Sequence, residues 1–194
     1  MLSWIFGTAA VLIWATLSAL VWYYITSANR RNERIQGDQR AHLFLNSESQ
    51  IADVVRQFPR SGVAAVRHAE FATAASNWDE AHQRWSVVRR RFPKDPRGYI
   101  VGARVLRELG RPDEAEAVLA RARRHVRPTA EIDIAFAAAA HGRQAWKEAA
   151  RRWAVVRRRH PKHKAGYLQG AAALRQIGKA AEADALVEAA KTLA

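Results

Sequence analysis

The sequence predicts an all-α protein built from stacked helical hairpins, and an internal repeat is the main reason. Residues 78–81 (WDEA) return as residues 146–149 (WKEA), 68 positions later, and residues 89–93 return as 157–161 at the same offset. Half that offset links four alanines that each follow a glutamate: Ala81, Ala115, Ala149 and Ala183. A fixed period of about 20–50 residues is typical of stacked-repeat proteins. No stretch alternates polar and apolar residues for long enough to predict a β-strand.

The first predicted element is a transmembrane helix over residues 2–25. This run holds no charged residue and is long enough to cross a bilayer core of ~30 Å at ~1.5 Å per residue. Trp4 near one end and residues 22–24 (WYY) at the other fit the aromatic belts of the two membrane interfaces. A cleaved signal peptide is the alternative, because residues 26–28 are small, although no basic residue precedes the run.

The residues that flank this run predict its orientation. Arg30, Arg31 and Arg34 follow it, whereas no Lys or Arg precedes it. The positive-inside rule then places the N-terminus outside and the repeats in the cytoplasm. The abundance of alanine and arginine suggests a bacterial source. The expected location is therefore a bacterial inner (cytoplasmic) membrane, crossed once, with the repeats on the cytoplasmic rather than the periplasmic side.

Residues 26–61 are expected to connect the membrane helix to the repeats. The polar part over residues 29–39 either continues the helix or forms a short basic tether, with Gly37 as its one expected break. Residues 58–59 (FP) stand one period of the repeat before residues 92–93 (FP), so they fall in phase with it. Terminal repeats of a solenoid are commonly atypical. We therefore expect a degenerate half-repeat here, which caps the solenoid.

Four repeat units follow, and the same residue types recur at fixed places in them. The predicted units are 62–95, 96–129, 130–163 and 164–194. A small residue recurs in the first helix, at Ala69, Ala103, Ala137 and Ala171. A large apolar residue recurs in the second helix, at Trp85, Leu119, Trp153 and Val187. An aromatic residue near the start of the first helix occurs only as Tyr99 and Tyr167, and Ala65 and Asp133 take its place in the other units. The four units therefore look like two copies of a pair.

This pattern resembles the tetratricopeptide repeat, a helix–turn–helix motif of about 34 residues. The resemblance covers about two-thirds of the chain and implies a solenoid of about four repeats, from residue 62 to residue 194. Proteins of this family typically bind extended peptides or partner helices in a concave groove lined by the first helices, which implies a protein partner here. A generic Ala-rich helical bundle is the alternative, but four units in phase argue against it.

The resemblance also indicates which residues face the groove. The corresponding positions in this chain are Arg97, Arg104, Arg107, His141 and Arg175. A groove lined by arginines favours an acidic peptide or helix, since a guanidinium binds carboxylates through charge-assisted hydrogen bonds. A second basic region, here called the basic rim, lies at the ends of two second helices and consists of Arg89, Arg90, Arg91, Arg157, Arg158 and Arg159. Cations there also complement the helix dipole, so the rim is either solvated surface or a contact for membrane or partner.

Composition excludes several other kinds of site. The net charge of +14 favours an acidic partner. Nucleic acid is the less favoured kind of partner, because the predicted anchor restricts access and the sequence lacks an exposed aromatic series. The chain has no cysteine and therefore no disulfide or thiolate metal site. No phosphate-binding loop, nucleophile with a base, or catalytic carboxylate pair is found, so we expect no enzyme activity, cofactor or metal. The tryptophans that recur in register are expected to be packing residues: Trp78, Trp85, Trp146 and Trp153.

These features together predict a membrane-anchored scaffold or adaptor for protein–protein interactions, acting in the assembly or regulation of a bacterial membrane or envelope complex. Two alternatives remain open. One is an accessory subunit of an envelope biosynthetic or cytochrome-maturation enzyme. The other is a module that binds anionic lipid or nucleic acid through the basic rim.

Overall fold

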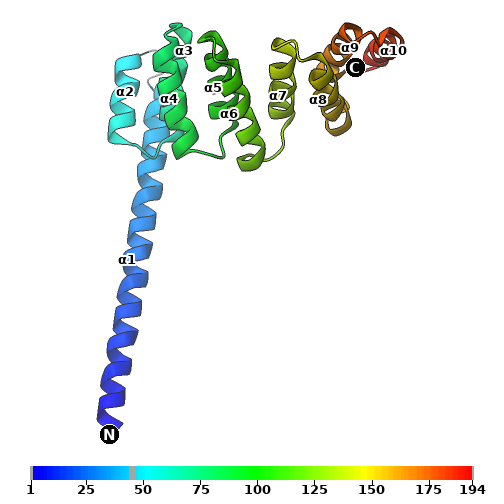
Figure 1. Ribbon diagram of the computed structural model, residues 1–194. Coiled ribbons are helices and arrows are strands. Elements are labelled where there is room, and N and C mark those ends of the chain that lie inside the picture. Colours follow the sequence, from blue (N-terminus) through cyan, green and yellow to red (C-terminus); the bar gives the residue numbers. More distant parts are fainter. Residues whose placement is uncertain (1, 44–46, 194) are drawn as a thin grey trace. The chain divides into compact units, whose positions relative to one another are not determined.

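The computed structural model describes the backbone of residues 2–43 and 47–193 and, within these ranges, the side chains from Trp14 onward. This part of the chain forms ten α-helices and no strand (Figure 1). The chain divides after His68 into two compact units, and each unit is described by itself. The first unit holds α1 (Leu2–Leu43), α2 (Glu48–Gln57) and the start of α3 (Gly62–Ala74).

The helix α1 corrects the prediction of a transmembrane helix over residues 2–25. Among the described residues, we find no helix with the length and apolar character needed to cross a membrane. The helix α1 runs on past Ile25 through charged residues such as Arg30, Arg31 and Glu33, so it is not apolar along its length. The side chains of residues 2–13 lie outside the described residues. The predicted inner-membrane location rested on this helix alone and is withdrawn with it.

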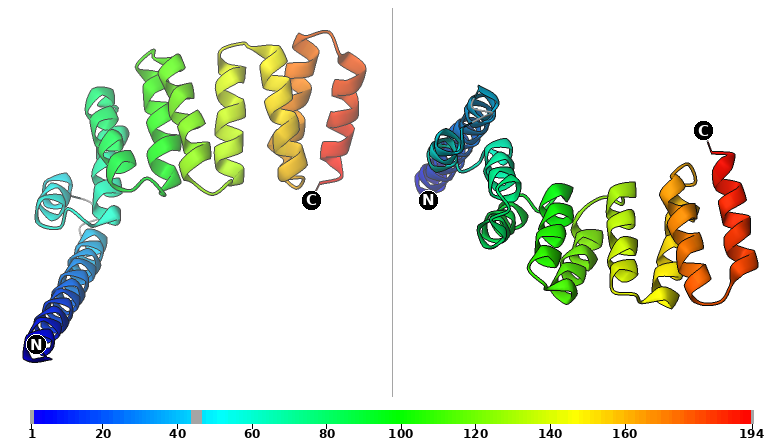
Figure 2. Two further views of the ribbon diagram at one scale, coloured as in Figure 1. Left: turned by 60° about the horizontal axis from the view of Figure 1, so that its bottom comes forward. Right: turned by 90° about the horizontal axis from the view of Figure 1, so that it is seen from above.

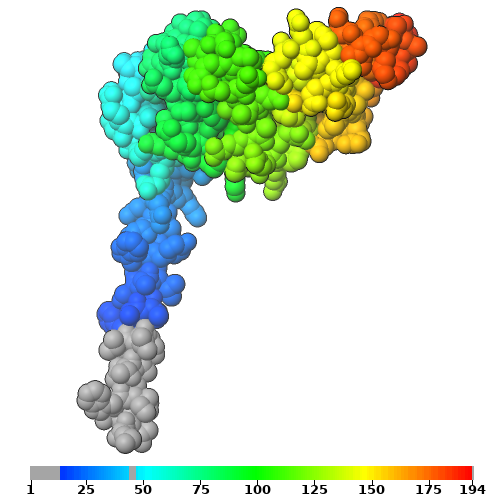
Figure 3. Space-filling model, in the orientation of Figure 1, coloured from blue at the N-terminus to red at the C-terminus, as the bar shows by residue number. Residues whose placement is uncertain are grey.

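Beyond Ile25 the helix α1 continues for several further turns, to Leu43. The large apolar side chains between Trp14 and Ile25 are exposed (Figure 3). Residues 29–39 therefore continue the helix and do not form a separate tether, and Gly37 lies inside the helix and does not end it.

Gly37 allows the chain after α2 to approach α1 closely. A Cβ atom built on this glycine would lie 2.6 Å from Phe58 Cβ and 2.7 Å from Ser61 Cβ, much closer than real Cβ contacts. Ser61 is buried and donates a hydrogen bond to Asp38 Oδ1 at 2.6 Å. The guanidinium of Arg40 stands 5.0 Å from the centre of the Phe58 ring. The first unit is thus held together by contacts along the C-terminal third of α1.

The second unit is a row of antiparallel helices that follow one another in chain order (Figure 2). After the end of α3 it contains α4 (Trp78–Arg91), α5 (Pro96–Glu108), α6 (Pro112–His125), α7 (Ala130–Gly142), α8 (Trp146–Arg159), α9 (Lys164–Gln176) and α10 (Ala180–Lys191). Each helix packs on the next, and α7 also contacts both α5 and α9. The helices α5, α7 and α9 therefore share one side of the row.

The residues that recur in sequence form the core of this row, as the repeat predicts. The alanines that follow glutamate, at positions 81, 115, 149 and 183, are fully buried. Trp85, Leu119 and Trp153 are buried against them, and Val187 is half-buried. Small residues at the helix crossings allow close approach, and the large residues fill the space between hairpins. Trp78 and Trp146, which were expected to be packing residues like Trp85 and Trp153, are only half-buried.

A left-handed backbone residue ends the first helix of each hairpin. Gly110 has a φ of 70° and Gly178 a φ of 77°. In the other two hairpins the same place is taken by Ser76 (φ 55°) and Gln144 (φ 58°). The four positions recur at the spacing of the repeat. In the third unit α7 runs to Gly142 and the turn follows at Gln144.

Candidate functional site

A hollow of about 510 Å³ opens on the side of the second unit that carries α5. It is lined by Glu70, Thr73, Ala74, Trp78, Trp85, Val101, Arg104 and Glu108. On α5, Val101, Arg104 and Glu108 are spaced three and four residues apart, so they lie on one face of the helix. The hollow therefore combines tryptophan surface from α4 with charged groups of both signs from α3 and α5.

The floor of the hollow is fixed by one hydrogen-bonded tryptophan. Trp85 has no exposed surface, and its indole Nε1 donates to Thr73 Oγ1 at 2.9 Å. The Thr73 hydroxyl donates in turn to the carbonyl oxygen of Ala69 at 2.9 Å. A buried indole with its N–H satisfied is held in one orientation. Trp78 is half-buried beside it and so retains surface that a ligand can contact.

The structure places three of the predicted groove residues on α5, but only one of them in the hollow. Arg104 is exposed and lines it. Arg97, near the start of α5, forms an ion pair with Asp95 (Nη2 to Oδ2, 2.7 Å), and this hydrogen bond raises the pKa of its guanidinium. Arg107 is exposed at the end of α5 and does not line the hollow.

The other two predicted groove residues lie on later helices. His141, near the end of α7, is half-buried with its ring 5.0 Å from the Trp146 ring in an edge-to-face arrangement. Its buried Nδ1 has no hydrogen-bond partner within the described part of the chain. Arg175, at the end of α9, pairs with Asp184 at 2.8 Å. The five residues therefore do not converge on one pocket.

The basic rim divides into covered and exposed arginines. Arg89 donates from Nη1 to the carbonyl oxygen of Gly98 at 3.0 Å, and a Cβ on Gly102 would collide with the same nitrogen. Arg157 repeats this arrangement on Gly166 (2.9 Å) and Gly170. Burial lowers the pKa of both guanidinium groups. These two arginines are therefore packing residues that cross the next helix at its glycines.

The remaining rim residues are Arg90, Arg91, Arg158 and Arg159, and all are exposed. Arg159 differs from the other three because its guanidinium reaches back to α7. Its Nη1 lies 3.3 Å from the Oδ2 atom of Asp133, whose side chain is only 4% exposed. His160 Nε2 lies 3.1 Å from the same oxygen, and Arg123 Nε lies 3.9 Å from Oδ1.

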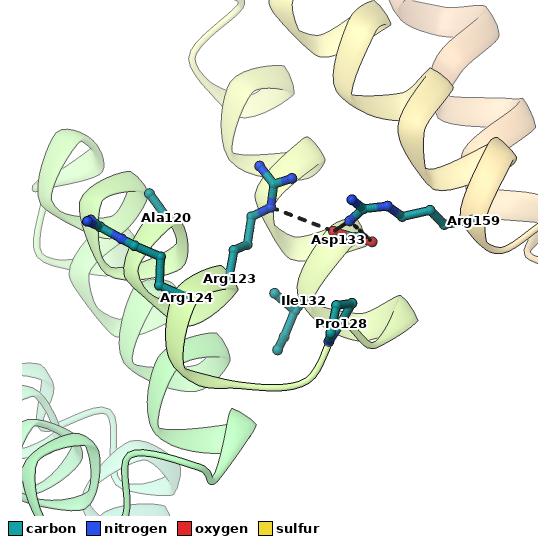
Figure 4. Close-up of a pocket in the computed structure, with 7 residues that line it drawn as sticks. All are labelled: Ala120, Arg123, Arg124, Pro128, Ile132, Asp133 and Arg159. Atoms are coloured by element: carbon teal, nitrogen blue, oxygen red, sulfur yellow. Dashed lines mark hydrogen bonds and ion pairs between the residues drawn. The ribbon is translucent and has the colours of Figure 1, made fainter.

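Asp133 thus gathers basic side chains beside a cavity of about 340 Å³ between α6, α7 and α8 (Figure 4). The cavity is lined by Ala120, Arg123, Arg124, Pro128, Ile132, Asp133 and Arg159. Sequence reasoning did not identify Asp133 or Trp78 as site residues. The sequence does contain a signal for Asp133, because a carboxylate stands at the repeat position that Tyr99 and Tyr167 occupy in the neighbouring units. Across the described residues, no group of three or more His, Asp or Glu side chains could hold a metal ion.

Comparison of the chain with protein-family models gives no match. Comparison with curated proteins gives none either. Solved structures do match. One is described as "YrrB: a TPR protein with an unusual peptide-binding site", with 15% identity, a TM-score of 0.64, and 86% of this chain and 90% of that chain covered.

Two further structures show the same similarity. The MamA protein has 12% identity and a TM-score of 0.67, with 83% of this chain and 89% of that chain covered. The pilF protein of Pseudomonas aeruginosa has 13% identity and a TM-score of 0.68, with 86% and 78% covered. At such low identity these likenesses concern the fold. Together with the buried repeat pattern and the row of hairpins, they show that this chain has the tetratricopeptide-repeat fold.

Proposed function

We propose that this chain is a protein-interaction scaffold that binds an extended peptide segment of a partner protein in the hollow on α3, α4 and α5. The observation that carries the proposal is the hollow itself, which offers half-buried tryptophan surface next to charged groups from α3 and α5. Peptide sites of repeat proteins lie along such extended surfaces. Of the structures similar to this one, one is described as having a peptide-binding site.

The charges of the hollow indicate which peptide fits. Arg104 is exposed, and it makes no ion pair within the part of the chain that the structure describes. Its guanidinium is available to bind a carboxylate through two parallel hydrogen bonds. Glu70 and Glu108 line the same hollow and repel a uniformly acidic ligand. The preferred peptide therefore carries one acidic residue for Arg104 and an apolar residue for the tryptophan surface at Trp78.

Selection from a random peptide library displayed on phage tests this preference. The full chain is compared with Arg104→Glu and Trp78→Ala. We expect the full chain to enrich peptides that pair an acidic with an apolar residue, Arg104→Glu to lose the acidic preference, and Trp78→Ala to lose the apolar one. Arg158→Glu is the matched control, since it makes the same charge change on an exposed residue that lines no part of this hollow.

Two results would count against the proposal. One is that the full chain enriches no peptide over an unrelated helical protein. The other is that Arg104→Glu and Arg158→Glu select the same peptides as the full chain, which would place binding elsewhere.

A role in the assembly of a bacterial envelope complex is the finer part of the proposal. It is supported by analogy alone, because one of the matching structures is PilW, described as a type IV pilus biogenesis factor, with 14% identity and a TM-score of 0.65. Photocrosslinking from position 104 in the cells of origin, with position 158 as the matched site, tests it. A partner captured only from position 104 that belongs to an envelope complex supports this role, and one from an unrelated complex contradicts it.

A further inference from the structure

The cavity between α6, α7 and α8 has a smaller counterpart one hairpin earlier, a hollow of about 220 Å³ lined in part by Arg89, Arg90 and Tyr99, and the repeat shows how the two differ. At the equivalent place one hairpin earlier, Tyr99 is buried and its hydroxyl donates to the carbonyl oxygen of Pro93 at 3.1 Å. Asp133 stands in that register position and is much smaller than tyrosine. The change from a ring to a carboxylate accompanies a larger cavity and places a charge where the tyrosine ring stands in the unit before.

The neighbouring arginine also changes place. Arg89 lies across Gly98 and Gly102 because these glycines leave room for it. Arg123 stands at the same place one repeat later, but Ile132 and Phe136 replace the two glycines. Arg123 therefore cannot cross the helix in the same way. Its guanidinium lies 4.9 Å from the centre of the Phe136 ring and points toward the cavity (Figure 4).

A second guanidinium reaches the cavity from the other side. Arg159 comes from the end of α8 and points toward Asp133, so Arg123 and Arg159 face the same carboxylate from different helices (Figure 4). Arg124 also lines the cavity, with its guanidinium turned away from Asp133. Each guanidinium has five N–H donors in a planar fork, whereas one carboxylate offers only about four acceptor sites, so Asp133 cannot accept from all the donors of two guanidinium groups. Asp133 leaves most of these donors untaken, the Arg123 and Arg159 side chains stay 39% and 41% exposed, and the cavity carries an excess of positive charge.

We propose that this cavity is a binding site for a phosphate group, which Arg123 and Arg159 hold between α6 and α8. Tetrahedral oxyanions suit guanidinium groups because two or more oxygens can accept hydrogen bonds at once. Asp133 is a positioning residue in this site: it is buried, and its two oxygens orient Arg159, His160 and Arg123 before any ligand is bound. The volume of about 340 Å³ admits inorganic phosphate or a small phosphate monoester.

The site is separate from the peptide hollow, with which it shares no lining residue, so neither proposal depends on the other. Structural packing alone does not require the carboxylate, since tyrosine stands at the equivalent place in the neighbouring unit, beside a smaller hollow of about 220 Å³. A buried carboxylate costs free energy unless it is paired, and the same pairing holds the arginines in place.

Isothermal titration of the full chain with inorganic phosphate, and separately with phenyl phosphate, tests the proposal at constant ionic strength. We expect saturable binding at one site per chain. Arg123→Gln and Arg159→Gln should each weaken it at least roughly tenfold, which corresponds to about 1.4 kcal/mol, because each variant loses charge-assisted hydrogen bonds to the phosphate oxygens. Arg158→Gln is the matched control, with the same loss of charge on an exposed neighbour outside the cavity, and should bind as the unchanged protein does.

The variant Asp133→Tyr distinguishes a specific phosphate site from the general attraction of anions to a basic protein. This substitution restores the residue of the neighbouring units and makes the chain one charge more positive. General attraction predicts tighter binding, whereas filling of the cavity predicts loss of binding. If circular dichroism shows that this variant does not fold, Arg123→Gln and Arg159→Gln decide the question.

The two ligands distinguish the source of the phosphate. Tighter binding of phenyl phosphate assigns the site to an esterified phosphate, and equal or tighter binding of inorganic phosphate assigns it to the free ion. Absence of saturable binding of both ligands to the folded protein, or equal weakening by Arg158→Gln, overturns the proposal.

Discussion

Replacing Gly37 by alanine tests how the first unit is held together. In most helix interiors this substitution stabilises a protein, because glycine costs about 1 kcal/mol relative to alanine. At this position the added methyl would lie 2.6 Å from Phe58 Cβ and 2.7 Å from Ser61 Cβ. Both of these atoms are attached directly to the backbone, so neither can rotate away. The chain after α2 must therefore move away from α1.

The expected sign follows from the two opposing magnitudes. Overpacking a close contact costs about 1–3 kcal/mol, and two backbone-attached atoms at this distance place the cost in the upper half of that range. The shift also disturbs the hydrogen bond from Ser61 to Asp38, which is 2.6 Å long. After subtraction of the gain in helix propensity, we expect Gly37→Ala to destabilise the first unit by about 1–2 kcal/mol.

Hydrogen–deuterium exchange of the full chain is the suitable assay, because stacked helical repeats need not unfold as one cooperative unit. We expect exchange in α2, residues 48–57, to speed up by about tenfold or more, which corresponds to about 1.4 kcal/mol. Exchange in α8, in the second unit, should not change.

The control is Gly142→Ala, since a Cβ on Gly142 meets no atom within 4 Å. This variant should be as stable as the unchanged protein or slightly more so. Unchanged or slower exchange of α2 in Gly37→Ala would falsify the close approach as the device that joins α2 to α1.

Three further outcomes follow from the second unit. Gln144→Gly should stabilise the protein by about 1 kcal/mol in urea unfolding, because Gln144 has a φ of 58° that glycine adopts without strain; a loss of stability would contradict this. Trp85→Phe should lower the free energy of unfolding in urea by about 1 kcal/mol more than Trp153→Phe does, because the Trp85 N–H donates at 2.9 Å while the Trp153 N–H has no partner among the described residues. Equal losses in the two variants would refute the reasoning. A hydrogen bond from Arg152 lowers the pKa of Glu148, so this pair stabilises the fold above the unfolded pKa of about 4.3, and its contribution is lost as pH falls through the lower folded pKa. The urea midpoint of Glu148→Gln should therefore drop less between about pH 5 and about pH 3 than the midpoint of the unchanged protein does. An equal drop in the two proteins would count against this role of the pair.

The repeated part of the fold was predictable because its information is local and periodic. Alanines that recur once per repeat mark helix crossings, and glycine marks two of the four hairpin turns, so the periodic pattern and chain order build the row. The N-terminal region up to Leu43 shows the opposite case. The apolar run over 2–25 was wrongly predicted to be a transmembrane helix, and neither the length of α1 nor the contact at Gly37 can be read from hydropathy.

The partners and the exposure of the charged side chains were decided by the tertiary structure. Arg89 and Arg159 look alike in sequence, as arginines at the ends of second helices. One lies across a helix on Gly98 and Gly102, whereas the other reaches Asp133 on a helix that precedes its own. A long, flexible side chain binds whatever partner the packed helices bring within reach. The sequence by itself therefore determined the helical hairpins and their order, and only the packed structure decided which arginines are covered and which face a cavity.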